Sequence, residues 1–186
     1  MKKYKVIYAD PPWSFGSKAY QDSGRNMLVL SETQYKTMTT QAIKKLPIQS
    51  IADEDSALFL WTTDAHLKEA IEVMEAWGFK YKTVAFNWVK RYASGSLVYN
   101  FAPWTLKSHE LCLLGIRGKM GQFKKSNAVK GLIEAERTEH SKKPVAARDR
   151  INELFGDINR IELFAREKTE GWDVWGNEVE SDIELK

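Results

Sequence analysis

The chain has 186 residues, 43% of them hydrophobic, and a net charge of +3, which predicts one domain spanning residues 1–186 and excludes disordered or low-complexity classes. No apolar run approaches the roughly 20 residues of a membrane-spanning helix, so we expect a cytoplasmic protein without a membrane partner. One cysteine, Cys112, and three scattered histidines argue against an intrachain disulfide and against a metal site.

Strand and helix patterns alternate along the chain. Short β-rich runs predict strands at residues 5–9, 57–62, 81–89, 110–116 and 161–165. Helices are expected at residues 31–46, with Ser31 and Gln34 as a capping box, from Asp64 to Gly78, and from Pro144 to Gly156. This order predicts an α/β fold with a mainly parallel sheet and helices on both faces. Ligands of such folds bind at the carboxyl ends of the strands, which directs attention to Asp10 and to the residues after Phe164.

The charge is unevenly distributed. Residues 80–150 hold 15 Lys or Arg against 5 Asp or Glu, whereas the rest of the chain holds 13 against 20. A basic middle third is typical of a surface that binds phosphates, although a solvated face without a partner has the same composition. The candidate substrate-binding side chains here are Lys90, Arg91, Trp104, Lys124 and Lys125, together with Tyr20 in the polar loop 14–30.

The sequence Asp10-Pro11-Pro12-Trp13 follows the first predicted strand and suits the methylation of an exocyclic amine. The amino nitrogen of adenine is a poor nucleophile because its lone pair is delocalised into the ring. The Asp10 carboxylate and the Pro11 carbonyl can accept its two N–H bonds and stabilise the positive charge that develops on attack. The prolines restrict the backbone, and Trp13 offers a face on which an extruded base can stack. A Pro-Pro strand end beside a core tryptophan is the structural alternative.

Several further motifs accompany this one along the chain. They are Leu58-Phe59-Leu60-Trp61, Trp77-Gly78-Phe79, Trp88-Val89-Lys90, His109 to Gly115, Ser141 to Pro144, Glu162 to Arg166, Gly171-Trp172 and Trp175 to Glu178. In order and spacing the chain resembles the permuted adenine-N(6) methyltransferases, which include the catalytic subunit of the eukaryotic mRNA adenosine methyltransferase and many bacterial and phage enzymes. The resemblance implies a Rossmann-like methyltransferase fold with a circularly permuted motif order.

The same resemblance implies S-adenosyl-L-methionine as the cofactor. Lys143 would contact its amino-acid end, near Asp10, while Glu162, Phe164 and Arg166 would bind the ribose and neighbouring groups. Asn177 and Glu178 would close over the ribose or the adenine. Glu110 resembles a family position near the target adenosine, and a solvated carboxylate at a strand edge is an equal interpretation of that residue.

The family leaves the substrate open. We expect adenine methylation in DNA, as in compact bacterial and phage enzymes, with the same reaction on RNA as one alternative. A catalytically silent nucleic-acid-binding subunit of a heterodimer is another, although such partners have lost the motif that is intact here. A nucleotide-binding oxidoreductase is disfavoured because no Gly-x-Gly-x-x-Gly follows a strand. A homodimer and a partner subunit both remain open.

Overall fold

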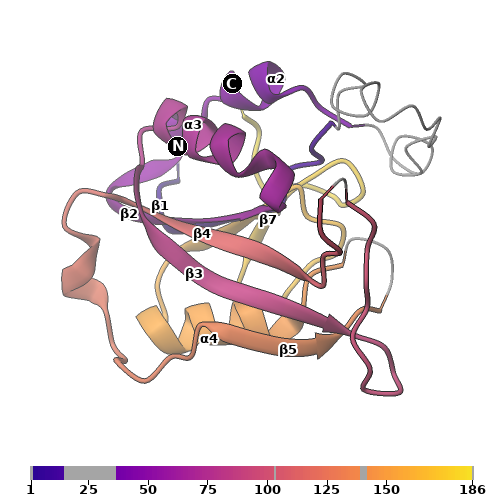
Figure 1. Cartoon of the computed structure of the whole chain (residues 1–186). Coiled ribbons are helices and arrows are strands. Elements are labelled where there is room, and N and C mark those ends of the chain that lie inside the picture. Colours follow the sequence, from indigo (N-terminus) through magenta and orange to yellow (C-terminus); the bar gives the residue numbers. More distant parts are fainter. Residues whose placement is uncertain (1, 15–36, 103, 139–141, 186) are drawn as a thin grey trace.

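The computed structural model describes residues 2–14, 37–102, 104–138 and 142–185 and has a curled, seven-stranded sheet at its centre (Figure 1). The order across the sheet is β5-β3-β4-β2-β1-β6-β7. These strands are β1 Tyr4–Ala9, β2 Ala52–Thr62, β3 Lys80–Arg91, β4 His109–Arg117, β5 Leu132–Glu136, β6 Arg160–Leu163 and β7 Asp173–Trp175. Only β4 of these runs against the others, because its pairings with β2 and β3 are antiparallel and every other pairing is parallel. The expected mainly parallel sheet is confirmed.

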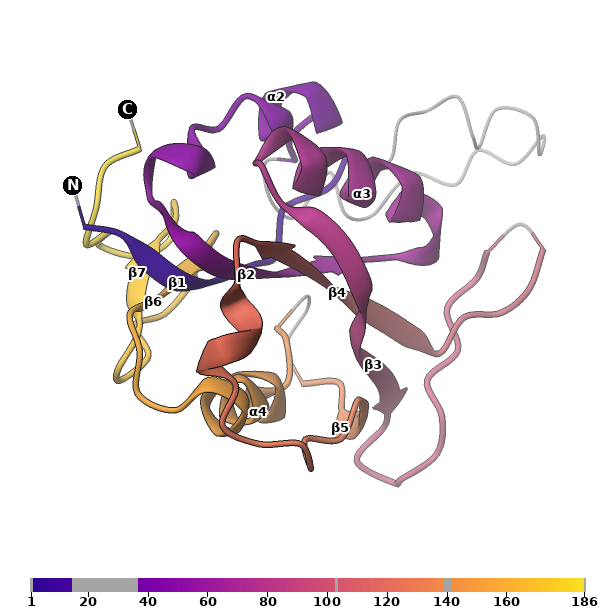
Figure 2. The ribbon, with the colours of Figure 1, turned by 90° about the vertical axis from the view of Figure 1, so that its left-hand side faces the viewer.

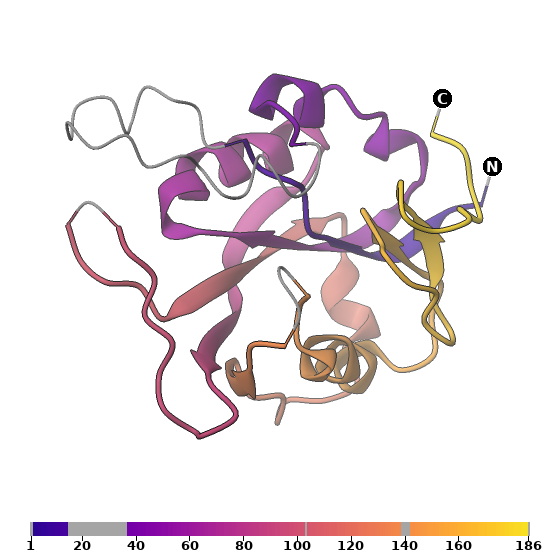
Figure 3. The ribbon, with the colours of Figure 1, turned by 90° about the vertical axis from the view of Figure 1, so that its right-hand side faces the viewer.

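Helices cover both faces of the sheet, as expected. Helices α2 (Thr40–Lys44) and α3 (Leu67–Ala76) lie on one face, and α4 (Val145–Phe155) lies on the other (Figures 2 and 3). Each face has its own apolar core, in which Trp77 packs on the α3 side and Phe155 on the α4 side. None of the helices in the described ranges is long and apolar enough to span a bilayer.

The predicted helix boundaries differ in accuracy. Helix α4 begins after Pro144 and ends at Gly156, whose φ of +70° suits glycine. The helix predicted for residues 31–46 is wrong at residues 37–39, since α2 begins only at Thr40 and Thr39 caps it by accepting the Ala42 N–H. Residues 37–39 are extended instead because Met38 pairs with the strand-like segment at Trp13. Ser31 and Gln34 themselves lie outside the described residues.

The other differences are smaller. Asp64 is not an N-cap but the first residue of a 3₁₀ turn, Asp64–His66, ahead of α3, and the N-cap residues Thr63 and His66 make no side-chain capping hydrogen bond. The Asp64 carboxylate contacts Lys107 and His109. The strands β5 and β7 were not predicted. Each of them pairs with a single neighbouring strand. Each is also too short to show a recognisable hydrophobic repeat.

The topology brings separate segments to one end of the sheet. The chain leaves β1 across the α2 face and enters β6 across the α4 face, so the direction of winding reverses at the adjacent strands β1 and β6. Such a reversal is where open α/β sheets bind ligands. Since β4 is antiparallel, its first residues meet the carboxyl ends of β1, β2 and β6.

Candidate active site

Asp10 directly follows β1 at the carboxyl end of the sheet. Its carboxylate is 29% exposed, and the Lys143 amino group donates to its Oδ2 at 2.6 Å. Lys143 comes from the segment ahead of α4, whose N-terminal end points toward this end of the sheet. The fold therefore places a buried lysine against the acid of the motif.

Glu110 joins the same cluster from the start of β4. Its Oε2 lies 3.2 Å from Lys143 Nζ, and the Lys90 amino group donates to Oε1. Acidic and basic groups thus alternate in the order Asp10, Lys143, Glu110, Lys90. Glu110 is buried in an ion-pair network, so its interpretation as a solvated edge carboxylate is wrong. Lys90 is likewise buried against Trp88 and is no surface cation.

The cluster sets the charge of its members. Burial raises the pKa of Asp10, Lys143 opposes this and Glu110 adds to it, and the outcome lies above the ordinary value. Burial also acts to raise the pKa of Glu110, but Lys143 and Lys90 outweigh it and lower that pKa. Burial acts to lower the pKa of Lys143, and the two carboxylates outweigh it and raise that pKa. Within this cluster, Asp10 is therefore the carboxylate whose pKa is shifted toward neutral pH.

Backbone hydrogen bonds hold the motif in place. The Trp13 N–H donates to the Pro11 carbonyl at 2.9 Å, and the Met38 N–H donates to the Pro12 carbonyl at 2.8 Å. Ser14 N–H donates to the Met38 carbonyl at 3.1 Å. A carbonyl oxygen has two lone pairs, so the Pro11 carbonyl retains one with which it can accept from a substrate amine.

Trp13 differs from the sequence expectation. Its side chain is 6% exposed, its Nε1–H donates to the Trp61 carbonyl at 3.0 Å, and its ring stacks on His66 with centroids 5.5 Å apart. The ring is part of the α3-side core and has little free face for a base. Its contribution is to anchor the motif between β2 and α3.

Glu162 and Phe164, which the family resemblance assigns to the cofactor, lie next to Asp10 in the sheet. Glu162 pairs in register with Tyr8 on β1, and Arg148 of α4 binds its carboxylate at 3.0 and 3.2 Å. Phe164 has a φ of +61° and packs edge-on against Trp175 with centroids 5.4 Å apart. This left-handed residue turns the chain sharply at the end of β6.

The remaining cofactor candidates surround the same strand ends. Arg166 and Glu178 are exposed and approach each other, with Arg166 Nε 3.5 Å from Glu178 Oε1. Asn177 is exposed beside them. They are held close to β6 because the Ala165 N–H donates to the Trp175 carbonyl at 3.0 Å.

The predicted substrate-binding residues are dispersed. Arg91 binds Glu134 and the Gly95 carbonyl at the end of β3. Trp104 is 96% exposed in the segment between β3 and β4, which projects beyond the sheet (Figure 2). Lys124 and Lys125 lie at the opposite end of the sheet from Asp10, where the Lys125 N–H donates to the Leu154 carbonyl near the end of α4. Tyr20 lies outside the described residues.

Sequence reasoning missed Arg148 and Trp61. Arg148 lies on the buried face of α4 together with Ile151 and Phe155; a charged residue at the helical spacing of a core face was the signal. Trp61 lies in the buried run of β2, its Nε1–H donates to the Tyr8 hydroxyl at 2.7 Å, and its ring lies 5.6 Å from Lys143 Nζ. Nothing in its sequence pattern separates it from an ordinary core tryptophan.

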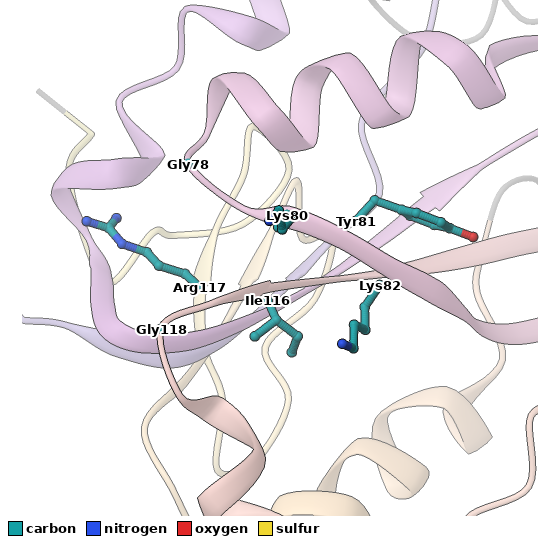
Figure 4. A pocket seen from close by; sticks show the side chains of 7 residues that line it. All are labelled: Gly78, Lys80, Tyr81, Lys82, Ile116, Arg117 and Gly118. Atoms are coloured by element: carbon teal, nitrogen blue, oxygen red, sulfur yellow. The ribbon is translucent and has the colours of Figure 1, made fainter.

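A cleft of about 430 Å³ lies at the far end of the sheet, between the start of β3 and the end of β4. Its cationic side chains, Lys80, Lys82 and Arg117, do not converge on one point (Figure 4). In the described ranges no group of three or more His, Cys, Asp or Glu side chains is placed to hold a metal ion.

Known proteins match this chain over almost its whole length. The model of the MT-A70 family matches residues 4–178. The chain is 38% identical over 189 residues to the Type II methyltransferase M.MunI of Mycoplasma sp, an alignment that covers 96% of this chain and 78% of that protein. It is 28% identical over 192 residues to human N(6)-adenine-specific methyltransferase METTL4 and 27% identical over 182 residues to the human N(6)-adenosine-methyltransferase catalytic subunit METTL3. Those alignments cover 96% of this chain in each case, and 38% and 28% of the respective human proteins.

Proposed function

This chain belongs to the MT-A70 family, and from that premise we propose that it transfers a methyl group from S-adenosyl-L-methionine to the exocyclic N6 amine of adenine in DNA, with residues 1–186 as a single methyltransferase domain. The observation that carries the proposal is the position of Asp10, which follows β1 at the reversal point of the sheet and is held at 2.6 Å by Lys143. A carboxylate fixed at a strand end is a preorganised acceptor for an amine.

The residues around Asp10 activate and orient the target amine. The Asp10 carboxylate accepts one N–H bond of the adenine amine, and the second lone pair of the Pro11 carbonyl accepts the other. Both acceptors draw the nitrogen toward a tetrahedral shape and stabilise the positive charge that develops on it. Lys143 and Glu110 fix the position of Asp10, so little reorganisation is needed when that charge appears.

The donor set around the strand ends fits the cofactor. When bound, S-adenosyl-L-methionine supplies an electrophilic methyl group on a cationic sulfur. Lys143 provides a cation suited to the amino-acid carboxylate, and Glu162 provides a carboxylate suited to ribose hydroxyls. Arg166, Asn177 and Glu178 are exposed beside β6 and can close over the outer part of the molecule.

DNA is the favoured substrate because the chain aligns with 78% of a bacterial Type II methyltransferase. The human relatives, named for adenine and for adenosine, are matched over a smaller part of their length. RNA is the second candidate, since no described side chain at the site is placed specifically to recognise the 2′-hydroxyl of a nucleotide.

The test is direct methylation. Purified protein, labelled S-adenosyl-L-methionine and matched DNA and RNA oligonucleotides are incubated, and the methylated nucleoside is identified after digestion. We expect N6-methyladenine in DNA from the wild-type chain and a rate about two to three decades lower from the Asp10→Asn variant. N6-methyladenosine formed much faster in RNA would reverse the choice of substrate, and no methylated product on either would overturn the proposed activity.

A further inference from the structure

Arg148 links α4 to the site through Glu162. Its Nη1 lies 3.0 and 3.2 Å from the two oxygens of Glu162, and its Nη2 lies 3.7 Å from Glu167 Oε1. The Arg148 side chain is 9% exposed and the Glu162 side chain 14% exposed. A charged pair is therefore built into the α4-side core directly beneath the carboxyl end of β6.

Such a pair is a poor means of stabilising a core. Removing two charges from water costs about as much as their attraction returns, and well-packed apolar residues often stabilise as well or better. In addition, Arg148 Nε is buried and makes no hydrogen bond to any described residue. The Arg148–Glu162 pair therefore contributes little to folding stability. This favours a role for the pair in keeping Glu162 charged.

We propose that Arg148 is a positioning residue of the cofactor site, which holds Glu162 ionised and oriented beside Asp10 so that its free lone pairs accept the ribose hydroxyls of S-adenosyl-L-methionine. The inference depends on the proposed function for its ligand. Each Glu162 oxygen uses one lone pair for Arg148 and retains another. The Glu162 side chain retains 14% exposure, and the proposal requires this exposed part to include the second set of lone pairs.

The charges around Glu162 show why it needs Arg148. Asp10, from the end of β1, and Glu167, from the segment after β6, both disfavour a second negative charge there. Tyr8 faces it from β1 and contributes no cation. Burial is the largest cause that raises the pKa of Glu162; Arg148 opposes it, and the pKa still lies above its ordinary value. Without that guanidinium, the carboxyl would become protonated at higher pH and lose one acceptor position.

The experiment measures cofactor affinity against pH from 6 to 9 by calorimetry, which needs no nucleic acid. In Arg148→Met we expect binding about tenfold weaker than wild type at pH 6, converging on wild type at pH 9 as Glu162 ionises. Arg148→Lys retains the cation and should keep the wild-type profile. Adding Glu162→Gln to Arg148→Met should remove the pH dependence that Arg148→Met introduces, because the glutamine amide does not titrate. Arg148→Gln serves where the Met variant does not fold.

Arg160→Met is the matched control. Arg160 is equally buried on β6 and bonds to Asn152 of α4, but at the opposite end of the strand from Asp10. The Arg160→Met substitution should lower the stability of the protein and leave the pH profile of cofactor binding unchanged. In Arg148→Met, a loss of affinity that is the same at every pH would overturn the claim that Arg148 keeps Glu162 ionised, and no loss at any pH would overturn the positioning role. Failure of the wild-type chain to bind the cofactor would count against the proposed function instead.

Discussion

At the scale of single residues, the ionisation and the orientation of Asp10 depend on its neighbours. Asp10 is a strand-end carboxylate between a buried lysine and a second carboxylate, Glu110. Lysine at this position compensates part of the burial of Asp10 and fixes its orientation. A free aspartate would present the same oxygens at random angles and would lose much of its effect on the amine.

Removal of the Asp10 charge should slow methylation strongly with little effect on the fold. Asp10→Asn keeps the shape but replaces one acceptor by a donor that repels the amine N–H. We expect methyl transfer to fall by two to three decades, the equivalent of about 3–4 kcal/mol, while most of the affinity for the cofactor and the melting temperature remain. The measurement is single-turnover methylation beside thermal denaturation. Near-normal turnover would rule out this mechanism.

The pH dependence of the rate should report Asp10. Because its pKa lies above the ordinary value, the rate at saturating substrates should fall on the acid side at higher pH than for an exposed aspartate. Lys143→Met removes the cation that opposes this shift, so the acid limb should move further toward high pH. Lys142→Met is the control, since Lys142 is more exposed and binds Glu167. Superimposable acid limbs for the two variants would contradict the coupling.

Trp13 should behave as a core residue. Trp13→Ala removes a buried indole and its hydrogen bond to Trp61, so the free energy of unfolding should fall by about 3–5 kcal/mol. Trp13→Phe should cost less because the stack on His66 is preserved. Urea denaturation of both variants measures this. A stable Trp13→Ala protein with a selective loss of DNA binding would instead support base stacking, as the motif alone suggested.

At the scale of elements, the return of the chain beside β6 depends on close backbone approach. A Cβ on Gly176 would lie 2.1 Å from the Ala165 carbonyl oxygen and 2.8 Å from its nitrogen. Only glycine allows the segment after β7 to lie against the residues after β6. Asn177 and Glu178 follow immediately, so the position of these cofactor candidates depends on this contact.

Gly176→Ala should therefore separate the two segments. The added methyl group meets backbone atoms that cannot rotate away, which displaces Asn177 and Glu178 and weakens cofactor binding about tenfold or more. Gly121→Ala is the control, because a Cβ there meets nothing within 4 Å. Isothermal calorimetry with S-adenosyl-L-methionine compares them. Equal affinity in both variants would show that this segment does not contribute to the site.

At the scale of the whole molecule, the basic third of the chain does not form one surface at the site. Lys90 and Lys143 are buried among carboxylates, Arg91 and Lys107 are paired, and Lys124 and Lys125 lie at the far end of the sheet. The excess of positive charge in residues 80–150 is thus divided between the ion-pair cluster around Asp10 and more distant faces.

The effect of Lys124 and Lys125 on DNA binding should depend on DNA length. Changing both to Glu should weaken binding of a duplex long enough to extend past the far end of the sheet and lower its salt slope by about two. A short oligonucleotide that covers only the Asp10 end of the sheet should bind this variant as tightly as it binds the wild-type protein. Titrations at several salt concentrations, with cofactor affinity as the control, measure this. Unchanged binding of both lengths would identify these lysines as a solvated face.

Much of the architecture was predictable from the residues. Proline and glycine delimited α4, and β-rich runs located β1, β2, β3, β4 and β6, since these signals are local. The start of α2 was not predictable, because the pairing of Met38 with the motif at Trp13 overrides local helix preference. Short edge strands such as β7 form only when a neighbour supplies their hydrogen bonds.

The sequence by itself determined the α/β class, the acid at the end of the first strand and the motifs that indicate adenine methylation, because these depend on residue type and spacing. Only the tertiary structure decided which of these residues meet. The antiparallel β4 brings Glu110 to Asp10, and the segment ahead of α4 brings Lys143 between them. Burial then decides roles that composition leaves open: Trp13 and Lys90 are packed inside, and Arg148 holds Glu162. Such contacts, which join residues 133 positions apart in the pair of Lys143 and Asp10, depend on the path of the backbone, which no local pattern encodes.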